Sequence, residues 1–255
     1  MNQPRIQITL IQIDNYGPWT TTLGNDREHQ LQILQAELYA SLQRNFSVRN
    51  ALVFFNKFDE MYAITNGISK DEHLKIREQA LSTFPFTVSM SIGVGSSPYE
   101  AQAQASRMLQ ATGSAQSEKR KMVLVGDHSL TLDESYAQII HIDVDGITKL
   151  IDHDDSFETS QKLVHTHAQL MELFSQHNSL LFYMGGDNFM GAIGQHDENA
   201  ILRGLEGIHI NGLALKYGIG RAATARKAAE LATMNLEQVR HQRKHLVSPL
   251  TRERR

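Results

Sequence analysis

Leu180-Leu-Phe-Tyr-Met-Gly-Gly-Asp187, together with Ile140-His-Ile-Asp143 before it, is the stretch on which the fold of this 255-residue chain depends. A similar arrangement occurs in the first half, as Ile11-Gln-Ile-Asp14 and Leu52-Val-Phe-Phe-Asn-Lys-Phe-Asp59. The two earlier aspartates are 129 positions apart and the two later ones 128. Because solenoid repeats have periods of roughly 20–50 residues, this spacing indicates a duplicated domain instead.

Each half predicts the same order of strands and helices. Alternating apolar residues favour strands, and apolar residues three and four apart favour helices. In the first half we predict strands at 5–13, 52–55, 61–65 and 87–93, helices at 26–45, 69–83 and 98–109, a break at 15–19, and an extra strand and turn within 123–133. In the second half we predict strands at 138–143, 180–184, 189–193 and 214–219, and helices at 157–177, 198–208 and 224–243. The prediction is an α+β protein of two tandem ferredoxin-like (palm-type) β-α-β-β-α-β domains from an internal duplication, covering residues 1–118 and 119–255.

Composition excludes several function classes. A net charge of −3 provides no electrostatic basis for binding nucleic acid or an anionic membrane surface. No apolar run approaches the roughly 20 residues of a membrane span, and the N-terminus lacks the pattern of a signal peptide. The chain has no cysteine, which excludes disulfides and thiolate-ligated zinc or iron–sulfur sites. We therefore expect a cytoplasmic protein that binds neither nucleic acid nor membrane.

Carboxylates follow the predicted strands in both halves. Asp143 and Asp145 are two residues apart, so they share one face at the end of a strand. Paired carboxylates suit Mg²⁺, which usually binds through one or two carboxylates and substrate phosphates. The alternative is an ordinary turn, since Asp-Gly is a common turn dipeptide. Asp14 is the corresponding candidate in the first half.

The predicted hairpin Gly185-Gly186-Asp187-Asn188 strengthens the hypothesis of a metal site. Two residues without Cβ leave room for a phosphate, and Asp187 is available to the same metal as Asp143. The first half repeats the carboxylate as Asp59 but has Lys57-Phe58 in place of the two glycines. This is either a decayed copy or a complementary half-site that uses Lys57 against phosphate.

The chain resembles a known family along nearly its whole length. Gly185-Gly-Asp-Asn-Phe189 is similar to the hairpin of GGDEF diguanylate cyclases and nucleotidyl cyclases, with Asn188 at the position of an acid. More specifically, Gln12-Ile-Asp-Asn-Tyr-Gly-Pro-Trp-Thr20, Pro85-Phe-Thr-Val-Ser-Met90 and the Gly185 string resemble the archaeal-type GTP cyclohydrolases, the third class of that activity.

The resemblance implies an enzyme that hydrolyses GTP at C8, opens the imidazole ring of guanine and releases pyrophosphate. It implies Mg²⁺ as cofactor, a monovalent cation such as K⁺ as activator, and a homo-oligomer, either a dimer or a tetramer. The other two classes use zinc held partly by cysteine, so the absence of cysteine is consistent with the third class.

The site residues implied by this resemblance come from both halves. Metal ligands are expected among Asp14, Asp59, Asp143, Asp145 and Asp187, and catalytic roles for His141, Asp143 and Asp187. Substrate contacts are expected from Asn15, Phe55, Lys57, Gly185, Gly186, Asn188 and Arg221. His141 alternatively packs as a structural histidine, and Phe55 alternatively belongs to the core. Asp145 stands where relatives carry amides, which weakens its role as a ligand.

Two other functions are compatible with a palm-type fold, because fold alone does not determine chemistry. One is a nucleotidyl cyclase or phosphoryl transferase acting on GTP, which would leave the guanine ring intact. The other is a non-catalytic GTP sensor, which would bind GTP without turnover.

Overall fold

The computed structural model describes residues 5–82, 84–126, 130–145, 155–208 and 214–247. The chain forms two compact units, and each is described by itself. The N-terminal unit comprises Met1–Ala137 with Ala223–Arg226, and the C-terminal unit comprises Gln138–Ala222 with Lys227–Arg255.

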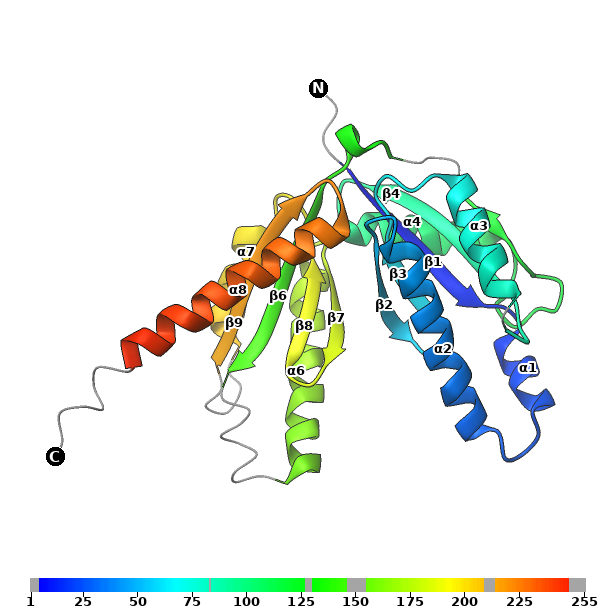
Figure 1. The fold of residues 1–255 in the computed structure, drawn as a ribbon, viewed down its shortest axis with the longest axis horizontal. Coiled ribbons are helices and arrows are strands. Elements are labelled where there is room, and N and C mark those ends of the chain that lie inside the picture. Colours follow the sequence, from blue (N-terminus) through cyan, green and yellow to red (C-terminus); the bar gives the residue numbers. More distant parts are fainter. Residues whose placement is uncertain (1–4, 83, 127–129, 146–154, 209–213, 248–255) are drawn as a thin grey trace. The chain divides into compact units, whose positions relative to one another are not determined.

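The N-terminal unit is a sheet with helices on both faces (Figure 1). Its elements are β1 (Ile6–Ile13), α1 (Tyr16–Thr22), α2 (Glu28–Ser47), β2 (Leu52–Lys57), β3 (Glu60–Ile64), α3 (Lys70–Leu81), β4 (Val88–Gly95), α4 (Pro98–Ala111) and β5 (Leu124–Val125). The strand order is β2-β3-β1-β4-β5. Strand β1 pairs antiparallel with both β3 and β4, which is the ferredoxin-like order that the sequence predicts.

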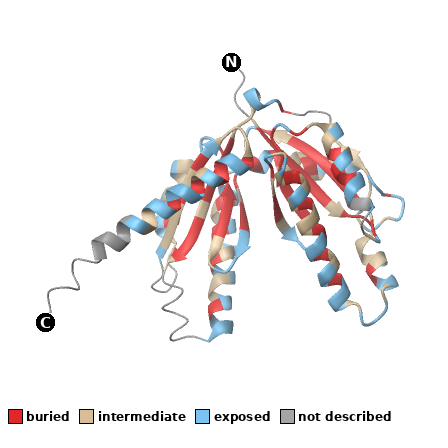
Figure 2. Ribbon diagram, viewed as in Figure 1, coloured by how far each residue is buried: buried red, intermediate tan, exposed pale blue. Residues whose placement is uncertain are grey.

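The C-terminal unit repeats this order. Its elements are β6 (Ala137–Asp145), α6 (Ser156–Gln176), β7 (Leu180–Gly185), β8 (Asn188–Ala192), α7 (Glu198–Gly207), β9 (Ala214–Ala222) and α8 (Ala225–Val247), with strand order β7-β8-β6-β9. One face of β6 presents Ile140, Ile142 and Val144 to a core that includes Leu170 and Phe174 of α6. Figure 2 shows the buried residues concentrated along the strands and on the inward sides of the helices.

Helix α8 lies on the opposite face of this sheet, against the backbone of β9. A Cβ at Gly220 would lie 2.0 Å from the carbonyl oxygen of Ala228, so only glycine permits this approach. Gly93 of β4 has the same relationship to Ala101 of α4, also at 2.0 Å. The close contact brings α8 over the polar side chains of β6.

Two local features differ from or refine the expectation. Helix α1 forms where a break is predicted, because Pro18 falls in its first turn, where proline is tolerated. Its Trp19 packs on Phe86, with ring centroids 4.8 Å apart. Leu124–Val125 forms the predicted extra strand and pairs parallel with β4.

The predicted boundary after residue 118 differs from the division after Ala137. Residues 119–137 belong with the N-terminal unit because β5 joins its sheet and Ser135 bridges Arg5. Within the described ranges, no helix has the length and apolar character required to cross a membrane.

Candidate functional site

The end of β6 carries three polar side chains on the face that α8 covers. His141, Asp143 and Asp145 alternate with the buried apolar residues of the other face, as strand geometry requires. Asp143 is only 7% exposed. The carboxylate that the sequence singled out is therefore largely buried at the edge of the C-terminal unit's core.

The β7–β8 hairpin places Asp187 beside this strand end. The backbone N–H of Val144 donates to the carbonyl oxygen of Asp187 at 3.0 Å, and Asn188 lies opposite Asp143 in the strand register. The amide of Asn188 donates to Oδ1 of Asp187 at 2.7 Å. The structure thus brings Asp143, Asp187 and Asn188 to neighbouring positions at one end of the sheet.

Gly185 and Gly186 form an open hairpin tip. Both have positive φ, 99° and 60°, a conformation that side chains with Cβ adopt with strain. A Cβ built at either glycine meets nothing within 4 Å. The glycines are therefore needed for backbone conformation, and the space beside them is open, as the prediction of a phosphate-binding tip requires.

His141 is held by both ring nitrogens. Nε2 lies 3.1 Å from Oδ1 of Asn188, and Nδ1 lies 3.0 Å from the hydroxyl of Thr233 on α8. Because the amide oxygen only accepts, Nε2 carries the proton in this arrangement. Burial is the largest influence on the pKa of His141 and lowers it below the ordinary value; the Asn188 hydrogen bond opposes this shift. The ring is therefore neutral at neutral pH.

Two cations face the carboxylates of β6. The guanidinium of Arg240 on α8 is paired with Oδ1 of Asp143, and Nζ of Lys216 on β9 lies 2.7 Å from Oδ1 of Asp145. Arg240, Thr233 and Lys216 are not among the site residues predicted from the sequence. Thr233 and Arg240 are seven residues apart and so share one face of α8, which is the signal that could have indicated them.

The strand register of the two units pairs different residues than the match between the two halves of the sequence does. The backbone N–H of Ile13 donates to the carbonyl of Asp59 at 2.9 Å, just as Val144 does to Asp187. Gln12 therefore corresponds to Asp143 in register, opposite Glu60, and Asp14 corresponds to Asp145. The equivalent positions of β1 and β6 are 131 apart rather than 129. A shift of two residues preserves the alternation of faces, which is why the sequence pattern did not reveal it.

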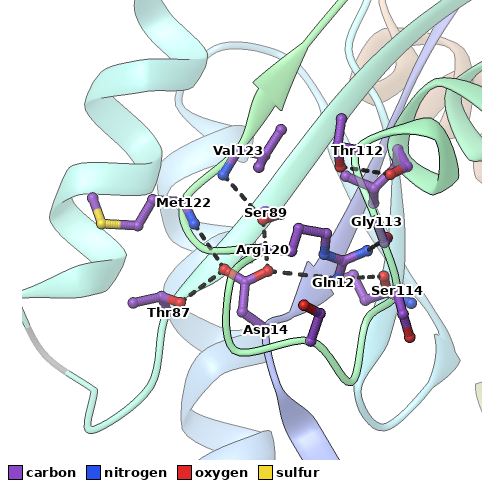
Figure 3. A network of polar contacts seen from close by, with 12 residues as sticks. Gln12, Asp14, Thr87, Ser89, Thr112, Gly113, Ser114, Arg120, Met122 and Val123 are labelled. Atoms are coloured by element: carbon purple, nitrogen blue, oxygen red, sulfur yellow. Dashed lines mark hydrogen bonds and ion pairs between the residues drawn. The ribbon is translucent and has the colours of Figure 1, made fainter.

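Asp14 lies in a closed polar network in the N-terminal unit (Figure 3). Its carboxylate accepts hydrogen bonds from the hydroxyls of Thr87 and Ser89, at 2.8 Å and 2.6 Å, and from the backbone N–H of Met122 at 2.9 Å. The guanidinium of Arg120 lies 3.5 Å from the same carboxylate and donates to Oε1 of Gln12 at 2.7 Å.

The remaining candidates of the N-terminal unit have individual partners. Lys57 forms an ion pair with Glu60 at 3.4 Å, and Asp59 is half-buried. Phe55 stacks on Tyr39, with ring centroids 4.2 Å apart. Asn15 adopts a left-handed conformation ahead of α1, and its buried Oδ1 accepts no hydrogen bond from the described residues.

Arg221 does not join the Asp143 site. It pairs with Glu198, which also accepts from Gln138 near the start of β6. Gln138 precedes Asp143 by five residues, which is about 16 Å along a strand. The structure therefore places Arg221 toward the other end of the sheet.

A cation at the C-terminal site would take few ligands from the protein. Across the ranges that the structure describes, no group of three or more His, Asp or Glu side chains is placed to hold a metal ion. Asp143 and Asp187 supply hard carboxylate oxygens, and Mg²⁺ commonly completes its coordination with water and substrate phosphates. This donor set fits Mg²⁺ delivered with a nucleotide.

Comparisons with known proteins identify the family of this chain. Residues 8–251 match the family described as GTP cyclohydrolase III. The GTP cyclohydrolase III of Methanothermobacter thermautotrophicus is 48% identical over 238 residues, covering 92% of this chain and 94% of that protein. The one from Methanocaldococcus jannaschii is 45% identical over 237 residues, covering 92% and 88%.

Solved structures with partial likeness include a GGDEF domain from Pseudomonas aeruginosa. It is 17% identical and covers 42% of this chain and 78% of that one, with a TM-score of 0.37. The assignment of the fold rests on the strand order of each unit, and the assignment of the family rests on the match along the chain. The chain belongs to the GTP cyclohydrolase III family.

Proposed function

We propose that this protein hydrolyses GTP at C8 of guanine, opens the imidazole ring to give 2-amino-5-formylamino-6-ribosylamino-pyrimidinone 5'-monophosphate, and releases pyrophosphate. The observation that carries the proposal is the match to GTP cyclohydrolase III relatives over 92% of the chain, at 48% identity for one of them. The proposed substrate is GTP. The protein is also proposed to form a homo-oligomer, either a dimer or a tetramer.

The C-terminal unit supports this function through its two carboxylates. Asp143 and Asp187 would hold Mg²⁺ against the triphosphate. When bound, the ion supplies positive charge that stabilises the developing charge on the phosphate oxygens. Asp145 is not a metal ligand in this proposal, because its carboxylate is paired with the ammonium group of Lys216. A monovalent cation such as K⁺ is proposed as an activator.

The hairpin tip would bind phosphate through its backbone. Gly185 and Gly186 have positive φ and no neighbouring atoms in the space that a Cβ would occupy. Successive backbone N–H groups in such turns form concave sites for anions. The tip is adjacent to Asp187, so a phosphate bound there would lie next to the carboxylate proposed to share its metal.

His141 is the proposed proton-transfer residue. Its neutral ring, with Nε2–H directed at Asn188 and Nδ1 at the Thr233 hydroxyl, has a defined tautomer. To accept a proton from water, it must exchange one of these partners for water or substrate when GTP binds. Asn188 links His141 to Asp187 and would keep the two catalytic candidates in a fixed relationship.

Analysis of the product of the purified protein with GTP and Mg²⁺, by ultraviolet absorbance and mass, tests the proposal. We expect loss of guanine absorbance, a formylamino-pyrimidine monophosphate and pyrophosphate. Asp187→Asn should abolish the product, whereas Asp59→Asn, at the equivalent hairpin position of the N-terminal unit, should retain it. A cyclic or dinucleotide product with intact guanine, or unchanged GTP, would contradict the proposal.

A further inference from the structure

The two units differ at the strand position where the C-terminal unit carries Asp143, a carboxylate proposed to bind the metal. Register pairs Gln12 with Glu60 in the N-terminal unit, where the C-terminal unit pairs Asp143 with Asn188. The N-terminal copy therefore has a neutral amide where the proposed metal site has its buried carboxylate. The carboxylate of Asp14 lies two residues further along the chain, at the position that corresponds to Asp145.

Asp14 has no acceptor capacity left for a metal. Oδ1 accepts from Ser89 and faces Arg120, while Oδ2 accepts from Thr87 and from the N–H of Met122. A carboxylate offers about four lone-pair sites, so these four partners occupy them. The Asp14 side chain is 1% exposed. A cation could bind here only by displacing an existing donor.

Arg120 already supplies the positive charge at this place. Its side chain is 2% exposed, and it contacts both Asp14 and Gln12, the two residues at the end of β1 (Figure 3). Arginine does not deprotonate under ordinary conditions, so this charge is permanent. Removing one partner of a buried ion pair leaves the other charge uncompensated, which is strongly unfavourable. A metal ion would have to overcome that cost.

The C-terminal unit presents the contrasting case. Arg240 is the one described partner of the Asp143 carboxylate, and its side chain is 30% exposed. Water can reach a guanidinium in this position, so Arg240 can leave Asp143 when a divalent cation arrives. The two units thus hold a fixed cation and an exchangeable cation at related positions.

From these differences we infer that Arg120 replaces the divalent cation in the N-terminal unit, and that of the two equivalent sites only the one in the C-terminal unit binds a divalent metal. The inference rests on the proposed function for the location of the metal site at Asp143 and Asp187. The inference assigns Asp14 and Asp59 to structural roles. It also favours the interpretation of the N-terminal hairpin as a decayed copy over that of a half-site that uses Lys57 against phosphate. Glu60, which accepts from Gln12 and Asn56 and pairs with Lys57, completes a self-contained cluster typical of a decayed copy.

The test compares matched substitutions at the two hairpin tips. Mn²⁺ binding to the full chain is measured by calorimetry and by electron paramagnetic resonance, first alone and then with a non-hydrolysable GTP analogue. Asp187→Asn should lose most bound Mn²⁺, and Asp59→Asn should bind as many equivalents as wild type. Asp59 is half-buried, its carboxylate has no hydrogen-bond partner among the described residues, and the substitution leaves its backbone bond to Ile13 in place, so its variant should fold.

Thermal unfolding provides a second readout that does not depend on turnover. Mn²⁺ should raise the melting temperature of wild type and Asp59→Asn equally, and should not raise that of Asp187→Asn. The inference is overturned if folded Asp59→Asn loses Mn²⁺ equivalents or its Mn²⁺-dependent stabilisation, or if wild type binds no Mn²⁺ in either condition. Failure of the proposed function is separate, since it appears as an intact guanine ring in the product analysis.

Discussion

The carboxylate of Asp143 is paired with the guanidinium of Arg240, which lies 97 residues later in the chain. The pair joins the end of β6 to α8 in the C-terminal unit. Arg240 therefore neutralises the buried carboxylate proposed to bind Mg²⁺, and the two cations compete for one anion.

Arg240→Met should strengthen binding of Mn²⁺ alone, because Asp143 would no longer have a competing positive charge. A partly exposed pair contributes about 0.2–1 kcal/mol, so we expect an affinity gain of about 1.4- to fivefold. Calorimetric titration of Mn²⁺ without nucleotide measures the change. Arg240→Lys retains the charge and serves as the control; equal affinities in wild type and Arg240→Met would show that Arg240 does not compete.

Arg120→Met should destabilise the N-terminal unit by about 3–5 kcal/mol, because the buried carboxylate of Asp14 would lose its counter-ion. Urea unfolding, followed by the fluorescence of the single tryptophan, Trp19, reports on this unit. Arg5→Met, in the same unit, is the control, since the side chains of its pair with Glu134 are 39% and 41% exposed and the pair should contribute less than about 1 kcal/mol. A loss below 1 kcal/mol for Arg120→Met would contradict the role assigned to the guanidinium.

His73 makes the stability of the N-terminal unit dependent on pH. The ring is fully buried, with Nε2 2.7 Å from the Thr9 hydroxyl and Nδ1 2.8 Å from the carbonyl of Ser69. Burial is the main cause that lowers the pKa of His73 from 6.5 to about 4. The folded state therefore favours the neutral ring, while the unfolded chain takes up a proton near pH 6.5.

The stabilisation from neutral His73 should be complete above pH 6.5 and should be lost as the pH falls from 6.5 to about 4. The full loss is about 3 kcal/mol. Urea midpoints measured at several pH values between 7.5 and 4, for wild type and His73→Gln, test this expectation. The variant should show a shallower pH dependence over that interval; parallel curves would refute the assignment to His73.

A substitution at Gly186 can distinguish the need for a left-handed backbone conformation from the need for open space beside the hairpin tip. Its φ of +60° disfavours alanine, by about 1 kcal/mol or more, whereas asparagine tolerates this conformation better. Gly186→Asn should therefore unfold at nearly the wild-type urea concentration and yet raise the KM for GTP, because its side chain enters the open space at the tip. Gly207→Ala, at the C-terminal end of α7, is the control, because a Cβ there meets nothing within 4 Å, and a Gly186→Asn variant with unchanged KM would argue against phosphate binding at the tip.

Local patterns in the sequence were sufficient for most elements of the fold. The helices and strands of both units follow from apolar periodicity, and Ser69 and Glu72 cap each other reciprocally at the start of α3. The hairpin containing Asp187 followed from its glycines. Helix α1 was missed because its proline and glycine suggest a break, while its stability comes from contacts such as Trp19 with Phe86.

The sequence by itself determined the duplication, the order of elements, the family and the Asp143–Asp187 candidate, because each depends on residue type and spacing along the chain. Only the tertiary structure decided that Gln12, rather than Asp14, corresponds to Asp143. It also decided which cation faces each carboxylate: Arg120 lies 3.5 Å from the carboxylate of Asp14, and Arg240 contacts Asp143 across 97 residues. A strand pattern of period two is unchanged by a shift of two residues, and the partners of a buried charge depend on packing between distant segments, so neither can be read from local sequence.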